Sequence, residues 1–195
     1  MPRARLLLLL FGLLLPVAGP APAAEPEARD PATEQQPPEA PPPVRIYGLR
    51  LEIVERGTYV TSTGTIRQMP NGIGENLVDE VELERSTTAI PARPGVSFGF
   101  EFLVHGQPAG TPIELTTTVL FPPPGLLPPG AAEPVVSSTT PMLVEVGAPG
   151  AVYRGYTFDY DWEVVPGPWR FEVRAGDRLL AVQSFIVTSE SSLRR

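Results

Sequence analysis

Residues 97–104, SFGFEFLV, place Phe98, Phe100 and Phe102 at every second position. Successive side chains of a β-strand point to opposite faces, so this spacing puts the three rings together on one buried face. The same alternation recurs in residues 49–53, 80–84, 113–121, 143–146 and 179–187. Alternation repeated this often is typical of half-buried antiparallel strands.

Turn-forming pairs separate these runs, among them Asn71-Gly72, Pro94-Gly95 and Pro166-Gly167. Residues 174–178, RAGDR, lie between two apolar runs and predict a tight hairpin. Only residues 75–85 have an apolar spacing that also fits a helix, and the alternation through Leu83 favours a strand. The pattern predicts an all-β fold, an antiparallel β-sandwich of about seven to nine strands over residues 44–188.

The first 43 residues have a different composition. A short basic head, an apolar run over residues 6–15 and a small-residue site at Ala21-Pro-Ala23 predict a signal peptide over residues 1–23. The apolar run is too short for the roughly 20 residues of a membrane span, so no integral span is expected after cleavage. Residues 24–43, rich in proline and acids, predict a disordered linker, and residues 189–195 a C-terminal tail. The expected location is periplasmic or secreted.

Composition excludes several chemistries. The chain has no cysteine and one histidine, which excludes disulfides, thiolate catalysis and the usual multi-histidine zinc site. Loss of Arg3 and Arg5 with the leader lowers the formal net charge from −7 to −9. An acidic domain without basic clusters is a poor match for a phosphate backbone, so nucleic acid is not expected as a partner.

Three acids, Asp159, Asp161 and Glu163, alternate with aromatic and apolar residues in YTFDYDWEV, residues 156–164. On a strand they would share one face, about 6.5–7 Å apart, and a hard cation such as calcium would bind there if neighbouring segments added oxygens. A solvated strand face is the simpler interpretation. A pair of these carboxylates acting on sugars is a third.

Three apolar residues are candidates for partner binding. Leu126 and Leu127 lie between prolines in the long apolar loop of residues 121–134, and Trp169 follows the turn at residues 166–168. The alternatives are structural: the leucines would cap an open end of the sandwich, and Trp169 would pack in the core near a corner.

No coherent catalytic set emerges from the residue types. Gly95-Val-Ser97-Phe-Gly99 matches the nucleophile elbow of serine hydrolases, but a strand pattern follows where that motif requires a helix. His105, which we expect in a surface loop, follows only six residues after Gly99. The chain is therefore predicted not to be an enzyme, and no cofactor is expected apart from the calcium considered above.

The stretches TSTGT (61–65), TTAIPARPGVSFGFEF (87–102), WEVVPGPWRFEV (162–173) and LLAVQSFIV (179–187) resemble the bacterial domain-of-unknown-function family numbered thirty-eight fifty-nine. The closing segments are also similar to the last hairpin of bacterial immunoglobulin-like modules. The resemblance implies an exported immunoglobulin-like β-sandwich without an assigned activity.

Three hypotheses for function follow in order. The first is a non-catalytic exported module that binds a cell-envelope protein or glycan. The second is a structural or assembly accessory with a cation on the acidic strand face. The third is a carboxylate-based enzyme acting on sugars.

Overall fold

The computed structural model describes residues 44–69 and 71–189. The predicted signal peptide, the predicted linker and residues 190–195 of the predicted tail lie outside the described residues. Within the described part of the chain, no helix is long and apolar enough to cross a membrane.

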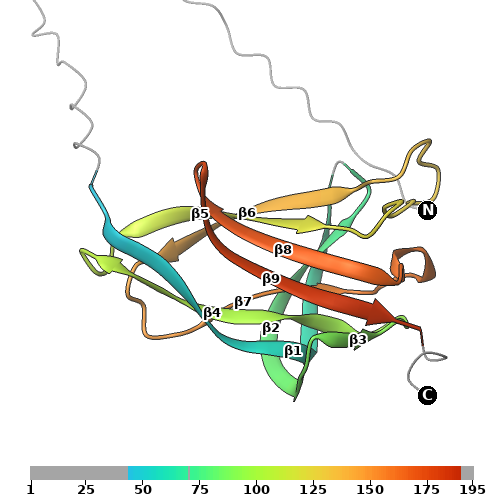
Figure 1. Cartoon of the computed structure of the whole chain (residues 1–195), viewed down its shortest axis with the longest axis horizontal. Coiled ribbons are helices and arrows are strands. Elements are labelled where there is room, and N and C mark those ends of the chain that lie inside the picture. The colour runs from blue at the N-terminus through green and yellow to red at the C-terminus, as the bar shows by residue number, and fades with distance from the viewer. Residues whose placement is uncertain (1–43, 70, 190–195) are drawn as a thin grey trace, which may run out of the picture. The chain divides into compact units, whose positions relative to one another are not determined.

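The described residues form nine strands and one short 3-10 helix, arranged as two sheets (Figure 1). One sheet has the strand order β2-β1-β4-β7, and the other has the order β3-β9-β8-β5-β6. The elements are β1 (Tyr47–Gln68), β2 (Gly74–Ser86), β3 (Ala89–Pro91), β4 (Ser97–Gln107), β5 (Pro112–Leu120), β6 (Ser137–Glu145), β7 (Val152–Thr157), η1 (Asp161–Glu163), β8 (Gly167–Ala175) and β9 (Arg178–Thr188). The predicted all-β sandwich is confirmed, with one parallel pair, β3 with β9, among the antiparallel ones.

The core lies between the sheets and is mainly aromatic. Phe98, Phe100 and Phe102 of β4 are fully buried, as their alternation predicts. Phe98 contacts Trp169 of β8 edge to face, with ring centroids 5.6 Å apart. Truncation of such a ring to alanine costs about 3–5 kcal/mol, so this aromatic cluster supplies much of the stability of a domain without disulfides.

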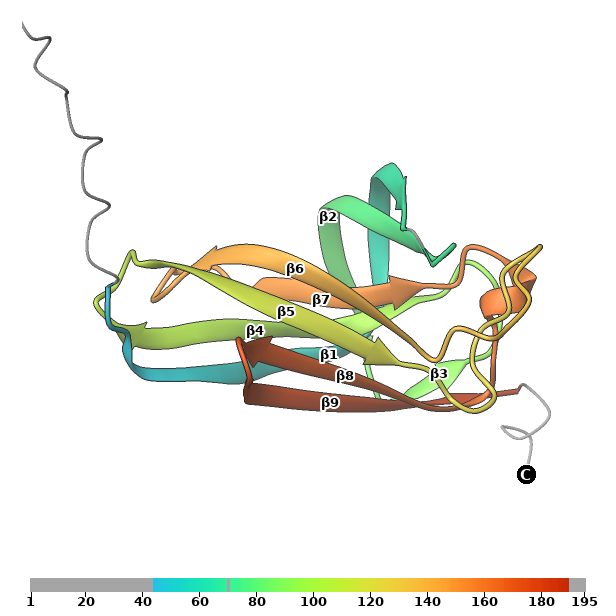
Figure 2. The same cartoon turned by 90° about the horizontal axis from the view of Figure 1, so that it is seen from above.

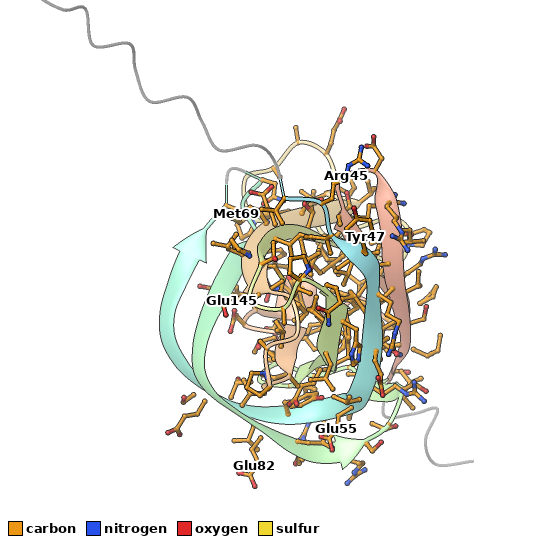
Figure 3. All side chains as sticks on the ribbon, turned by 90° about the vertical axis from the view of Figure 1, so that its left-hand side faces the viewer. Arg45, Tyr47, Glu55, Met69, Glu82 and Glu145 are labelled. Atoms are coloured by element: carbon orange, nitrogen blue, oxygen red, sulfur yellow. The ribbon has the colours of Figure 1, made fainter. Side chains whose placement is uncertain are left out.

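The first two strands form a long hairpin that leaves the plane of the sandwich. The N-terminal part of β1 pairs with β4, whereas its part from Gly57 onward pairs with β2. Figure 3 shows β1 curving from Tyr47 past Glu55 and on round to Met69, and in Figure 2 the hairpin rises above the sandwich. Its tip is anchored because Ile73 is buried in the core and the Asn71 side chain donates a hydrogen bond to Ser138 Oγ of β6. Residues 75–85 belong to β2, which confirms the strand over the helix.

One sandwich edge is formed by β6 and β7, the outermost strands of their sheets in the described fold. Pro141 lies in the middle of β6, opposite Thr116 of β5. Proline is tolerated on an edge strand because its missing N–H can face away from the neighbouring strand.

Candidate binding sites

The acidic stretch does not form the predicted strand. Strand β7 ends at Thr157, and Phe158 makes two last backbone hydrogen bonds, to Val96 O and from Gly95 N. The chain then turns through Asp159 and Tyr160 into η1. The prediction that Asp159, Asp161 and Glu163 share one strand face is therefore wrong, because a turn follows Phe158 and sends successive side chains in different directions.

Glu163 is the centre of this turn. Its side chain is 1% exposed. One carboxylate oxygen accepts hydrogen bonds from the backbone N–H groups of Asp159 and Tyr160, at 2.6 and 2.9 Å, and the other accepts one from the Tyr156 hydroxyl at 2.9 Å. Burial raises the pKa of Glu163, and these three hydrogen bonds oppose that rise. The carboxylate thus fixes the backbone of residues 159–163 from the inside.

This arrangement does not suit the predicted cation. Both oxygens of Glu163 face donors within the protein, whereas Asp161 is exposed to solvent. In the described residues, no group of three or more His, Cys, Asp or Glu side chains is placed to hold a metal ion. Calcium needs six to eight oxygen ligands, which the turn does not bring together.

The turn presents two aromatic side chains at the surface. Tyr160 and Trp162 stack nearly parallel, with ring centroids 5.9 Å apart and an interplanar angle of 10°. Trp162 also packs against the core, whereas Tyr160 is 48% exposed. Trp162 therefore supports one face of the Tyr160 ring. Sequence analysis placed both rings in the aromatic ladder and missed this pair.

The predicted partner-binding residues separate in the structure. Trp169 and Leu126 are fully buried, so their prediction as partner contacts is wrong. The Trp169 indole N–H donates to Val165 O, and Leu126 pairs with Val135 inside the loop, so both serve the core and its cap. Leu127 is 51% exposed and remains available at the surface. Figure 2 places its loop and η1 at the same end of the sandwich.

The two residues considered for catalysis lie in β4. Ser97 is buried and shares hydrogen bonds with the hydroxyls of Thr61 and Thr157, at 3.0 and 2.8 Å. His105 belongs to the strand rather than to a loop, and its Nε2 lies 2.9 Å from Glu52 Oε2. Ser97 opens the strand that His105 nearly ends, so the two do not form a nucleophile and base pair.

Two hollows lie along the edge formed by β6 and β7. One, of about 100 Å³, is lined by Thr61 of the hairpin and by hydroxyl residues of β5, β6 and β7, including Thr117 and Thr157. The other, of about 330 Å³, is mainly apolar and is lined by residues such as Met142 and Val152. The first is much smaller than the roughly 300–1,000 Å³ typical of small-molecule pockets. Neither was foreseen from the sequence, because both depend on how the strands pack.

Comparison with known proteins gives the family context. A family model described as a domain of unknown function, DUF3859, matches residues 51–187. A crystal structure of an immunoglobulin-like protein from Pseudomonas aeruginosa is 30% identical and superposes with a TM-score of 0.53, covering 72% of this chain and 96% of that one. The search of curated proteins found no match.

Proposed function

The chain belongs to the DUF3859 family, whose members have no assigned function, and we propose that it is an exported, non-catalytic module that binds a cell-envelope glycan. The observation that carries the proposal is the aromatic pair Tyr160 and Trp162 on the turn fixed by Glu163. Export rests on the predicted leader of residues 1–23.

A supported aromatic ring suits a sugar. The exposed ring of Tyr160 offers an apolar face to the C–H groups of a pyranose, and Trp162 behind it limits its motion. Asp161, exposed on the same turn, supplies oxygens that accept hydrogen bonds from sugar hydroxyls. Because Glu163 already fixes the backbone, little conformational entropy is lost on binding.

The non-catalytic part of the proposal has its own support. The Glu163 carboxylate already accepts three hydrogen bonds from within the protein, and Ser97 bonds to threonine hydroxyls. These groups hold structure in place and are not poised over an open pocket. Asp161, the exposed acid of the turn, is in contact with solvent.

Binding is tested with purified peptidoglycan and lipopolysaccharide as probes, by co-sedimentation and tryptophan fluorescence. The chain has two tryptophans, and Trp169 is fully buried, so a change in emission on binding would report Trp162. We expect Tyr160→Ala to weaken binding about tenfold, since loss of stacking on a sugar removes about 1–1.5 kcal/mol, like other aromatic contacts. Tyr47→Ala, which removes a 65% exposed tyrosine far from the turn, is the matched control.

Several results would contradict the proposal. Equal loss of binding in Tyr47→Ala and Tyr160→Ala would make the contact non-specific. Binding that is lost only in Leu127→Ala would favour a protein partner at the loop of residues 121–136. Export is tested separately by cell fractionation and by mass spectrometry of the N-terminus, where an uncleaved leader would contradict it.

A further inference from the structure

The tip of the hairpin formed by β1 and β2 carries an asparagine followed by a glycine, Asn71 and Gly72. Gly72 has a φ of +80°, and a Cβ there would lie 3.2 Å from Pro128, so the fold requires glycine at this position. The next residue, Ile73, is buried in the core, and its backbone N–H donates to Asn71 Oδ1 at 3.1 Å. The tip therefore brings an asparagine side chain and a glycine nitrogen together in one tight turn.

The hydrogen bond from Ile73 folds the Asn71 side chain back over the peptide group that joins Asn71 to Gly72. Asparagine commonly accepts such a bond from the N–H two residues on, and its side-chain carbonyl then lies beside the intervening nitrogen. That nitrogen belongs to Gly72, which is exposed and has no side chain to hinder an attack on Asn71 Cγ. Nucleophile and carbonyl are held close together, which is the condition under which intramolecular reactions are fast.

Two further groups contact the atoms that change charge in such an attack. The Ile73 N–H already donates to Oδ1, the oxygen that becomes negative when a nucleophile adds to Cγ, and its distance suits an oxyanion donor. On the other side, Ser138 Oγ of β6 lies 3.3 Å from Asn71 Nδ2, the group that leaves. A hydroxyl within hydrogen-bond reach of a leaving nitrogen can pass it a proton. One bond opposes the reaction, because the Gly72 N–H donates to Met69 O at 2.9 Å and must break that bond.

We propose that Asn71 is a site of spontaneous covalent modification, at which the Gly72 nitrogen attacks Asn71 Cγ and closes a succinimide ring. The bond between this nitrogen and Cγ forms, and the bond between Cγ and Nδ2 breaks. The Gly72 nitrogen gives its proton to solvent, and the leaving NH₂ group takes one through the Ser138 hydroxyl, so ammonia is released. Water then adds to either carbonyl of the ring and leaves aspartate or isoaspartate at position 71.

The isoaspartate product weakens the anchor of the hairpin. It adds one methylene to the backbone directly before the buried Ile73, so the tip no longer holds both this burial and the contact with Ser138. Met69 and Ile73 line the hollow of about 100 Å³ between the hairpin and the sandwich edge, so the change opens that hollow on one side. This site is separate from the sugar-binding turn, so either proposal can fail alone.

The test incubates the purified full chain in mildly alkaline buffer and follows each asparagine by peptide mass spectrometry, with isoaspartate methyltransferase labelling to identify the product. The sequence has one other asparagine, Asn76 of β2, and a leucine follows it, so it is a control within the same molecule. We expect Asn71 to convert at least about tenfold faster than Asn76, which corresponds to about 1.4 kcal/mol in the barrier, because the leucine side chain hinders the attacking nitrogen.

The role of the fold is tested with a synthetic peptide of residues 68–75. We expect Asn71 to convert in the folded chain at least as fast as in this peptide, where no second strand positions its side chain. Slower conversion in the folded chain than in the peptide would overturn the proposal, because the turn would then protect Asn71.

Ser138→Ala tests the proton donor. It should slow conversion about threefold, as for loss of one weak neutral hydrogen bond, whereas Thr139→Ala, which removes an exposed hydroxyl next to it on β6, should not. Faster conversion in Ser138→Ala would show that Ser138 only restrains the side chain, and would overturn its assignment as the donor.

The effect on the anchor has its own readout. The purified isoaspartate form should unfold about 5–10 °C below the unmodified chain, as expected when one buried isoleucine leaves the core. Asn71→Asp, which adds the charge without the extra methylene, should lower Tm much less. An isoaspartate form as stable as Asn71→Asp would overturn the claim that the modification weakens the anchor.

Discussion

Glu163 is fully buried and Glu101 is partly buried, and burial raises the pKa of each. Their surroundings differ. Glu163 accepts three hydrogen bonds, whereas Glu101 has another glutamate opposite and an unpartnered tyrosine hydroxyl near it. A buried carboxylate with a complete set of donors holds a turn together. One beside a like charge has no donor to oppose the rise in its pKa, so it adds no such stability to its charged form.

The largest effect is expected for Glu163→Ala. This change leaves the N–H groups of Asp159 and Tyr160 and the Tyr156 hydroxyl without their acceptor, and each costs about 1–3 kcal/mol when buried. We expect a loss of about 4 kcal/mol in the free energy of unfolding, or roughly 10–15 °C in Tm. Chemical and thermal denaturation measure it, with the exposed Asp161→Ala as control. A loss similar to that of the control would show that the turn holds without Glu163.

Glu163→Gln separates the hydrogen bonds from the charge. The amide oxygen can accept both N–H groups, and its NH₂ can donate to Tyr156, so the loss at pH 7 should stay below about 1.5 kcal/mol. Because burial raises the pKa of Glu163, the native state binds its proton more tightly than the unfolded chain. The stability from this group is present below the unfolded pKa of about 4.3 and is lost as pH rises through the folded value.

The wild type should therefore lose stability relative to Glu163→Gln as pH rises from the unfolded pKa of Glu163 to its folded pKa. Above the folded pKa, the difference in the free energy of unfolding should stay constant. Denaturant unfolding of both proteins between about pH 4 and 8 measures this difference in the free energy of unfolding. The series begins near the ordinary pKa of a glutamate, where the shift is expected to begin. A difference that shifts in favour of the wild type with rising pH would mean that the hydrogen bonds outweigh burial.

Tyr59→Phe should change stability in the opposite direction. Removing a buried hydroxyl that has no partner should raise the free energy of unfolding by about 1 kcal/mol. Tyr156→Phe is the matched comparison, because its hydroxyl donates to Glu163 and its removal should destabilise by about 1–2 kcal/mol. Equal losses in both variants, measured by urea unfolding, would show that Tyr59 has a partner in solution.

The smallest expected effect is that of Glu101→Gln. It removes one charge of a like-charged pair across neighbouring strands, which should stabilise the domain by about 0.2–1 kcal/mol. Burial and Glu55 raise the pKa of Glu101, so this gain should appear as pH rises above the folded pKa of the acid. It should shrink in about 1 M salt, where the screening length is roughly 3 Å. A gain that salt does not change would point to packing instead of charge.

The sequence was sufficient for the strands with clear alternation and for the turns between them. Phe98, Phe100 and Phe102 face the core because period two is a local property of the backbone. The same rule failed after Phe158, since alternation of acids and aromatics continues there although the backbone turns. The Glu163 side chain accepts from the backbone N–H of Tyr160, as the glutamate of a capping box does, but Tyr160 is not one of the residues that mark this motif in a sequence, so the turn had no clear local signal.

The surface pairs and the candidate sites depended on information that a sequence does not hold locally. Glu55 and Glu101 are far apart in the chain and become neighbours only through the register of β1 and β4, which shifts between Ile53 and Glu55. One residue of slippage would place one of them on the opposite face. Likewise Leu126 and Leu127 look alike in sequence, and only the local pairing with Val135 decides which of them is buried.

Pro141 bears on how the protein behaves at high concentration. An edge strand with free N–H groups can be extended by a strand of another molecule, which is a common start of aggregation. In the middle of β6, the position opposite Thr116 has no amide hydrogen to offer to such a strand. Continuous pairing along β6 is therefore interrupted at its centre, and molecules of this protein are hindered from joining their sheets through that edge.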